Sequence, residues 1–276
     1  MKNLKIAGMA LIAVTVLATS CRKKGCTDET AYNYNDEAKK DDGTCTYENT
    51  ATLKFTQSWD GNNVTSSDFD EIKFKNANDE NMSIVRLRYS ISDVRFYKAD
   101  GDSVMIDMHH LIDVSDATTL TKVLDQKIDP IDYTGIGFIF GLTPDKNVSG
   151  SILEFNAATW NWPEMIGGGY HQMQFDGKFI NADTDTIGYN FHNGSVTKDA
   201  GSSDAAVPNY IFVKLDQTIA MNSDKTIEID MQIGEWFKNP NLWDLNTLYT
   251  MLMPNKAAQL LISENGKSVF KLGAIN

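Results

Sequence analysis

The sequence predicts an all-β protein: an antiparallel β-sandwich with a few short helices, preceded by a small disulfide-closed repeat. Three observations support this prediction. Many short segments alternate apolar and polar residues, as strands with one buried face do. Turn signals such as Asp60-Gly61 and Asp100-Gly101 separate these segments. Near the start, two cysteines bound a polar stretch that is too short to form a core of its own.

The chain begins with the pattern of a secretory signal. A basic start is followed by an apolar run, 6–18, which is shorter than the ~20 residues of a membrane span. The small residues before Cys21 resemble a bacterial lipobox, so residues 1–20 are predicted to be a lipoprotein signal peptide and Cys21 to carry lipid. Ordinary signal cleavage is the alternative. Lipid would anchor the protein to the outer membrane of the cell envelope. Because 22–24 lacks an acidic run linked to surface export, we favour the periplasmic side.

Segment 21–48 is predicted to be a tether and a Cys-bounded repeat. If Cys21 carries lipid, Cys26 and Cys45 remain, and an exported protein would pair them. The segment resembles a short repeat of secreted Bacteroidetes proteins, with Cys-Thr-Asp, Ala-x-Asn-Tyr and Asp-Asp-Gly-x-Cys. Its spacing is not that of a DxDxDG loop, and a solvated disulfide spacer is the alternative to a calcium site. The candidate calcium ligands are Asp28, Asn33, Asn35, Asp36, Asp41 and Asp42.

Charge excludes one class of partner. Cleavage after residue 20 removes two lysines and leaves 23 basic against 37 acidic side chains, a net charge of −14. A chain this acidic has no electrostatic basis for binding nucleic acid.

Residues 49–276 are predicted to form the sandwich, because a stretch of that length is ample for one β-domain. The predicted strands are 53–57, 85–91, 94–97, 135–141, 210–215 and 226–231. Weaker helical patterns cover 120–124, 242–251 and 255–264, and Gly266 would end the last helix. Segments 144–151 and 193–208 are predicted to be polar loops.

Two of the four histidines lie in the most informative part of the sequence. His171 follows a run of three glycines and Tyr170, and His192 opens His-Asn-Gly-Ser. Imidazole and thioether are copper ligands, and Met165 and Met173 lie close to His171 in sequence. Glycines let the backbone and ligands approach closely, and on a strand from Tyr170 the side chains of His171 and Met173 would share a face. For each histidine, a satisfied core or surface residue is the alternative.

Other chemistry-bearing residues have plainer interpretations. His109 and His110 are neighbours, so on a strand they point to opposite faces and are expected at an edge or surface. Glu164 and Asp176 are carboxylates near the histidines, but no Ser, Cys or His relay accompanies them in the sequence. The sequence therefore predicts that the protein is not an enzyme.

From about residue 52 to 273, the chain resembles the MbnP-type domain of methanobactin-associated periplasmic copper-binding proteins. Ordered motifs carry the resemblance: Leu53-Lys54-Phe55, 86–95, His110-Leu111-Ile112-Asp113, 135–144, 162–177, Phe191-His192-Asn193-Gly194-Ser195 and 265–270. The resemblance implies a β-sandwich that binds copper through histidines and an oxidised tryptophan, kynurenine. It also implies a diheme peroxidase-like partner, which makes the kynurenine.

The resemblance assigns roles by position. His192 matches the His of the His-x-Gly-Ser motif, Trp162 lies in the Trp-rich motif, and Trp160 is its near alternative. Many relatives have a first-strand histidine where this chain has 57–59, Gln-Ser-Trp, so the site has either moved to His171, His192 and methionines or been lost. We expect a lipid-anchored copper-binding protein. The alternative is a glycan- or protein-binding lipoprotein with a degenerate metal site, in which Trp160, Trp162 and Tyr170 contact the ligand.

Overall fold

The computed structural model describes residues 22–196 and 209–276. The predicted signal peptide, Cys21 and most of the predicted loop 193–208 lie outside these residues. The chain divides into two units between Tyr47 and Glu48. None of the described helices is long and apolar enough to cross a membrane.

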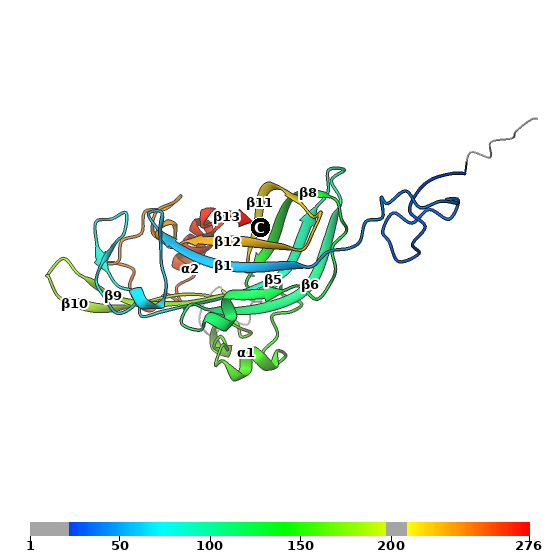
Figure 1. The fold of residues 1–276 in the computed structure, drawn as a ribbon. Helices are drawn as coiled ribbons and strands as arrows, with labels where there is room; N and C mark the ends of the chain where they lie inside the picture. The colour runs from blue at the N-terminus through cyan, green and yellow to red at the C-terminus, as the bar shows by residue number, and fades with distance from the viewer. Residues whose placement is uncertain (1–21, 197–208) are drawn as a thin grey trace, which may run out of the picture. The chain divides into compact units, whose positions relative to one another are not determined.

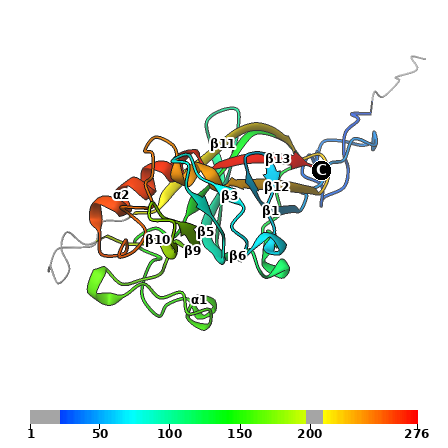
Figure 2. The same ribbon diagram turned by 90° about the vertical axis from the view of Figure 1, so that its left-hand side faces the viewer.

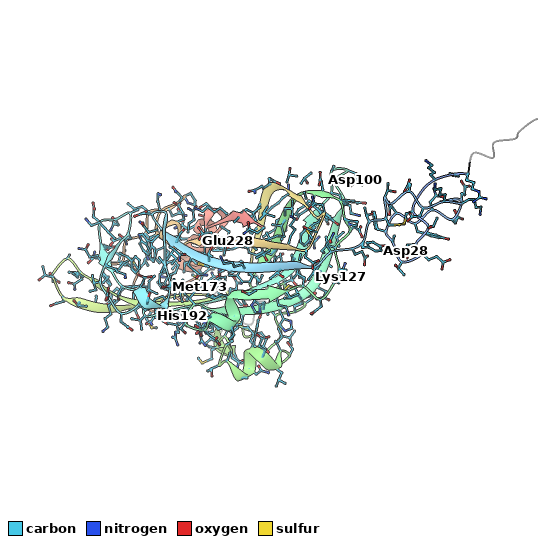
Figure 3. All side chains as sticks on the ribbon, viewed as in Figure 1. Asp28, Asp100, Lys127, Met173, His192 and Glu228 are labelled. Carbon is cyan, nitrogen blue, oxygen red and sulfur yellow. A yellow bond between two sulfur atoms is a disulfide. The ribbon has the colours of Figure 1, made fainter. Side chains whose placement is uncertain are left out.

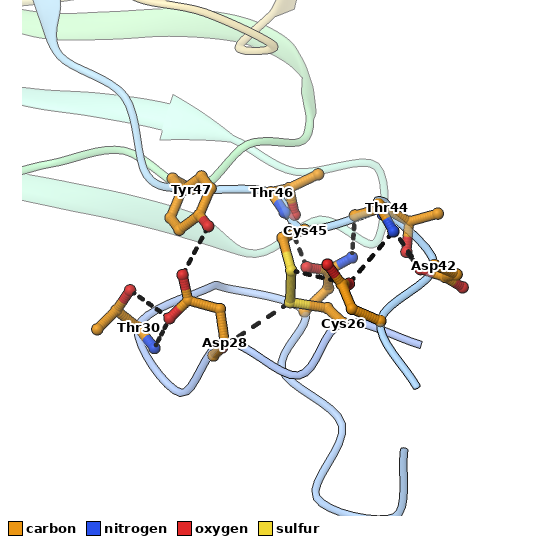
Figure 4. Close-up of a disulfide and its surroundings, with 11 residues drawn as sticks. Cys26, Asp28, Thr30, Asp42, Thr44, Cys45, Thr46 and Tyr47 are labelled. Carbon is orange, nitrogen blue, oxygen red and sulfur yellow. Dashed lines mark hydrogen bonds between the residues drawn. A yellow bond between two sulfur atoms is a disulfide. The ribbon is translucent and has the colours of Figure 1, made fainter. Parts of the chain in front are cut away.

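The N-terminal unit is held by its disulfide and by short turns. Cys26 and Cys45 are bonded, which confirms the predicted pair. Around them, the Asp28 carboxylate accepts hydrogen bonds from Thr30 and from the Tyr47 hydroxyl, 2.7 Å away (Figure 4). These hydrogen bonds, the backbone one from Thr30 first, lower the pKa of Asp28. This carboxylate therefore stabilises turns, and calcium binding by the repeat stays a prediction.

The second unit is a sandwich of two sheets around one core (Figures 1 and 2). The smaller sheet has the order β13-β12-β1-β2, with β7 also paired to β1. Its strands are β1 (Ala51–Trp59), β2 (Asn62–Asn63), β7 (Thr121–Val123), β12 (Lys225–Gln232) and β13 (Phe270–Ile275). Because β1 and β12 are joined by a long crossover, no tight turn fixes their direction, and they pair in parallel. The sandwich prediction is confirmed with this one parallel pair, since the other described ladders are antiparallel.

The larger sheet has the order β11-β8-β5-β9-β4-β3, with β6 paired to β5 and β10 to β9. Strand β5 is central to this sheet. It pairs with β6 along one edge, and along its other edge it pairs first with β9 and then with β8. Two predicted strands, 85–91 and 94–97, are parts of β5 and are joined through Asp93, whose φ is 53°. The strands are β3 (Phe74–Lys75), β4 (Asn81–Met82), β5 (Arg86–Tyr97), β6 (Ser103–Asp113), β8 (Asp132–Phe140), β9 (Met173–Ile180), β10 (Thr186–Asn193) and β11 (Ile211–Ala220).

The helices are short, and one of the three predicted ones is present. Helix α2 (Lys256–Asn265) is capped by the Asn255 side chain and ends before Gly266, as predicted. The others are α1 (Leu153–Ala157) and the 3-10 turns η1 (Ser66–Asp68), η2 (Ala117–Leu120), η3 (Glu164–Ile166), η4 (Ile233–Phe237) and η5 (Gly266–Ser268).

The helices predicted at 120–124 and 242–251 are wrong. Residues 121–123 pair with β1 as β7, where β-branched Thr121 and Val123 suit an extended strand. Within 242–251, the amides of Leu245 and Asn246 donate to the buried Glu80 carboxylate. These tertiary bonds satisfy backbone groups that a helix would otherwise pair internally.

Candidate metal site

The candidate site is built on the β9–β10 hairpin, whose two faces differ. Directly paired residues of an antiparallel ladder share a face. Phe175 pairs with Phe191, and both belong to the main core. Gln174 pairs with His192, so these side chains take the opposite, outer face.

A long connection, residues 141–172, covers part of that outer face and carries α1 and η3. The three glycines 167–169 have φ values of 126°, 64° and 81°, a region that side-chain-bearing residues rarely adopt. Their turn doubles the chain back, so that the Trp162 amide donates to Gly169 and the His171 amide donates to the Trp160 carbonyl, at 2.9 Å each. The glycine run thereby brings both tryptophans beside His171.

The structure brings His171 and His192 together. Their ring centroids are 5.2 Å apart and the planes are nearly perpendicular. Trp162 and Trp160 pack against His171, with centroid distances of 4.9 and 5.5 Å. The histidines are only 6% and 9% exposed, and their Nδ1 atoms are buried with no hydrogen-bond partner among the described residues. Two buried, unpartnered ring nitrogens are a feature that calls for a ligand.

Asp176 is hydrogen-bonded to His192, a contact that was not predicted from the sequence. Its Oδ1 lies 2.8 Å from Nε2 of His192 and accepts a hydrogen bond from Asn190, while Oδ2 accepts one from Nε of Arg86 and forms an ion pair with the same guanidinium. Burial raises the pKa of Asp176, but the bonds from His192 and Asn190 and the Arg86 charge outweigh it and lower the pKa to about 2. A predicted hairpin would have revealed this contact. In the β9–β10 ladder Asn190 pairs directly with Asp176, and His192 is the next residue on the same face of the strand.

Burial also sets the protonation of His171. Loss of water contact, then the neighbouring His192 and Arg88, lower the pKa of the His171 imidazole to about 3. The guanidinium of Arg88 lies over the Trp160 ring, 5.3 Å from its centroid, and donates to Gln174. His171 is therefore a neutral ring at every physiological pH, ready to act as a ligand.

The two methionines do not join the histidines. Met165 is 79% exposed. Met173 is fully buried in the main core and pairs with Asn193, which places it on the opposite face from His192. Figure 3 labels both residues. The expected shared face of His171 and Met173 fails because a bend at Gln172 interrupts the alternation before β9 begins. Across the part of the chain that the structure describes, no group of three or more His, Cys, Asp or Glu is arranged to hold a metal ion.

The aromatic residues of the site are buried. Trp160, Trp162 and Tyr170 expose essentially nothing, so they offer no ring face to a glycan or a protein, contrary to that alternative. The Trp162 ring lies against Gly194, where a Cβ atom would overlap it. The glycine of the His-Asn-Gly-Ser motif is thus needed for the tryptophan beside the histidines.

The remaining candidates lie elsewhere. Gln57, at the position range of the relatives' first-strand histidine, donates to the Tyr89 hydroxyl inside the core. It is therefore separated from His192 by the larger sheet. The neighbours His109 and His110 point to opposite faces as predicted: the first ring contacts Phe155 and the second contacts Phe55.

Comparison with known proteins agrees with the fold. The MbnP family model matches residues 48–254. A solved structure of MbnP from Methylosinus trichosporium superposes with a TM-score of 0.57 at 14% sequence identity, covering 83% of this chain and 99% of that chain. At that identity, the likeness shows the shared fold. No curated protein matches the chain.

Proposed function

The chain belongs to the MbnP family, and from this premise we propose that it is a copper-binding protein of the cell envelope whose ion is held by His171 and His192. Trp162, as kynurenine, would complete the site. The family supplies the expectation of copper, whereas the two histidines are this chain's own.

The observation that carries the proposal is the pair of buried, unpartnered Nδ1 atoms. Bonds from a metal to imidazole nitrogen are roughly 2 Å long, so two nitrogens that share one ion lie within about 4 Å of each other. Rings whose centroids are 5.2 Å apart permit that spacing. Imidazole is a good ligand for copper, and His171 needs to lose no proton on binding. A site of this kind would take copper with two protein nitrogens and without thioether sulfur.

The geometry favours binding over catalysis. Asp176 and His192 form a carboxylate–imidazole pair, as in hydrolases. However, the other ring nitrogen of His192 meets no hydroxyl or thiol in the described chain, and the nearby Ser195 hydroxyl accepts from Asn147 instead. The MbnP family is not known as a family of enzymes, and we propose no reaction for this chain.

Lipid at Cys21, an outer-membrane location on the periplasmic side and a diheme peroxidase-like partner are further parts of the proposal. The intact mass of the native protein tests lipid attachment and tryptophan oxidation together. A Cys21→Ser variant that stays in the membrane fraction after a carbonate wash would count against the anchor.

Anaerobic Cu(I) calorimetry tests the central claim. We expect one ion per wild-type chain, a large loss of affinity for His171→Ala or His192→Ala, and no binding by the double variant. His109→Ala is the matched control, because the His109 ring is exposed and contacts Phe155 rather than either histidine of the pair. A double variant that binds copper as tightly as wild type would place the site elsewhere.

A further inference from the structure

Asp176 is held more firmly than an ordinary surface carboxylate. Three hydrogen bonds and an ion pair reach it from two neighbouring strands: Oδ2 accepts from Nε of Arg86 on β5 at 2.6 Å and lies 2.5 Å from an Nη atom of the same guanidinium, and Oδ1 accepts from Asn190 and His192 on β10. Hydrogen bonds to charged groups are roughly twice as strong as neutral ones, and here both carboxylate oxygens are engaged. The carboxylate plane therefore has little freedom to turn.

This arrangement decides which nitrogen of His192 carries the hydrogen. An ionised carboxylate only accepts hydrogen bonds, so the Nε2 atom 2.8 Å from Oδ1 must be the donor. In a neutral imidazole the hydrogen then sits on Nε2, and Nδ1 keeps its lone pair. Nδ1 is the buried atom without a partner.

The backbone of His192 is fixed from the other side. Gln259 of α2, which is fully buried, donates from Nε2 to the His192 carbonyl at 2.7 Å and accepts from the Gly194 amide at 3.2 Å. With the main chain held by α2 and the ring held by Asp176, the direction of Nδ1 is set before any ligand arrives.

We propose that Asp176 is a positioning residue of the metal site: clamped by Arg86, it fixes the Nε2–H tautomer of His192, which then presents Nδ1 to the ion. This inference rests on the proposed copper function for its consequence, but the tautomer itself is a property of the metal-free protein. Carboxylates that orient metal-binding histidines typically change metal affinity by ~10–100-fold when mutated.

Nitrogen-15 NMR of the histidine rings in the metal-free, full-length protein provides the direct test. Wild-type His192 should show a protonated Nε2 and an unprotonated Nδ1. In Asp176→Asn, the single carbonyl oxygen faces the Arg86 guanidinium, and the amide NH2 turns to His192. The ring should then shift toward the Nδ1–H tautomer, and Cu(I) affinity should fall by ~10–100-fold.

Asp93→Asn is the matched control. Asp93 is also a buried carboxylate of the larger sheet, paired with Lys146, and asparagine tolerates its positive φ. This variant removes a comparable ion pair, yet it should leave the His192 ring signals and the copper affinity unchanged.

Two results would overturn the inference. One is an Nδ1–H tautomer in the wild-type protein, a measurement that does not depend on the folding of any variant. The other is unchanged ring signals and copper affinity in Asp176→Asn. A wild type that keeps the Nε2–H tautomer but binds no copper would refute the proposed function and leave the role of Asp176 in fixing the ring intact.

Discussion

At the open end of the β9–β10 hairpin, residues 173–176 and 191–193, both faces are buried, yet they have opposite chemistry. The core face carries Phe175 and Phe191, and Phe191 packs on Trp243 and Phe237 at centroid distances of 4.7 and 5.0 Å. The outer face carries Asp176 and His192, linked by hydrogen bonds and covered by the connection 141–172. One face therefore stabilises the fold through apolar burial, and the other holds polar groups in a fixed arrangement, so stability and metal binding should respond separately to mutation.

The largest expected effect separates the faces directly. Phe191→Ala should destabilise the fold by ~3–5 kcal/mol, because it removes a fully buried ring and leaves a cavity. His192→Ala should cost less, about 1–3 kcal/mol for a lost buried hydrogen bond, yet remove most copper affinity. Urea unfolding and Cu(I) titration of both variants check this. Equal losses of stability would show that the outer face supports the fold as strongly as the core.

The second effect depends on pH. The pKa of His171 is about 3 in the folded protein and near 6.5 when unfolded, so between these values the unfolded chain binds a proton that the folded chain does not. The stability that neutral His171 preserves is complete above pH 6.5 and is lost toward pH 3, by up to ~1.4 kcal/mol per pH unit. Metal-free His171→Asn should lose this part of the slope in urea unfolding at pH 7, 5.5 and 4.5. If the free energy of unfolding of His171→Asn changes with pH as steeply as that of wild type, His171 does not contribute to the pH dependence.

The same low pKa changes the expected pH dependence of copper binding. From sequence alone, affinity should fall once the pH drops below the ordinary histidine value of about 6.5. With the pKa of His171 lowered by burial, protons compete for this ligand only in much stronger acid.

A smaller effect is expected at Gly194, where the outer face meets Trp162. Gly194→Ala places a Cβ atom inside the indole ring and should destabilise by ~1–3 kcal/mol, as overpacking does. Because Trp162 packs on His171, copper affinity should fall as well. Gly188→Ala on the same strand is the control, since its nearest neighbour would be at 3.8 Å. Equal behaviour of the two variants would mean that Trp162 does not support the site.

The smallest effect tests Met173 as a ligand. Met173→Leu keeps the apolar volume on the core face and should cost less than ~1.5 kcal/mol. Copper affinity should be unchanged, because Met173 faces away from His192. A marked fall in Cu(I) affinity with stability preserved would bring the thioether back into the site.

The sequence by itself determined several features. Alternating residues identified the strands β1 and β5, an apolar run identified β8, and β11 and β12 were also predicted as strands. The count of cysteines identified the Cys26–Cys45 bond. The glycine run and the His-Asn-Gly-Ser motif picked out His171 and His192, which the fold brings within 5.2 Å. These signals are local: they depend on period, on backbone freedom and on residue type.

Only the tertiary structure decided the rest. Strands β9 and β10 were not predicted, although apolar and polar residues alternate along both; in the structure β9 is buried on both faces over its first five residues, whereas exposure alternates along most of β10. Period two says which residues share a face, but not which face meets the core. That choice put Met173 in the core. It also brought Asp176, His192 and Arg86 together from three strands, a contact that depends on the pairing of Arg86 with Asp176, 90 positions apart in sequence.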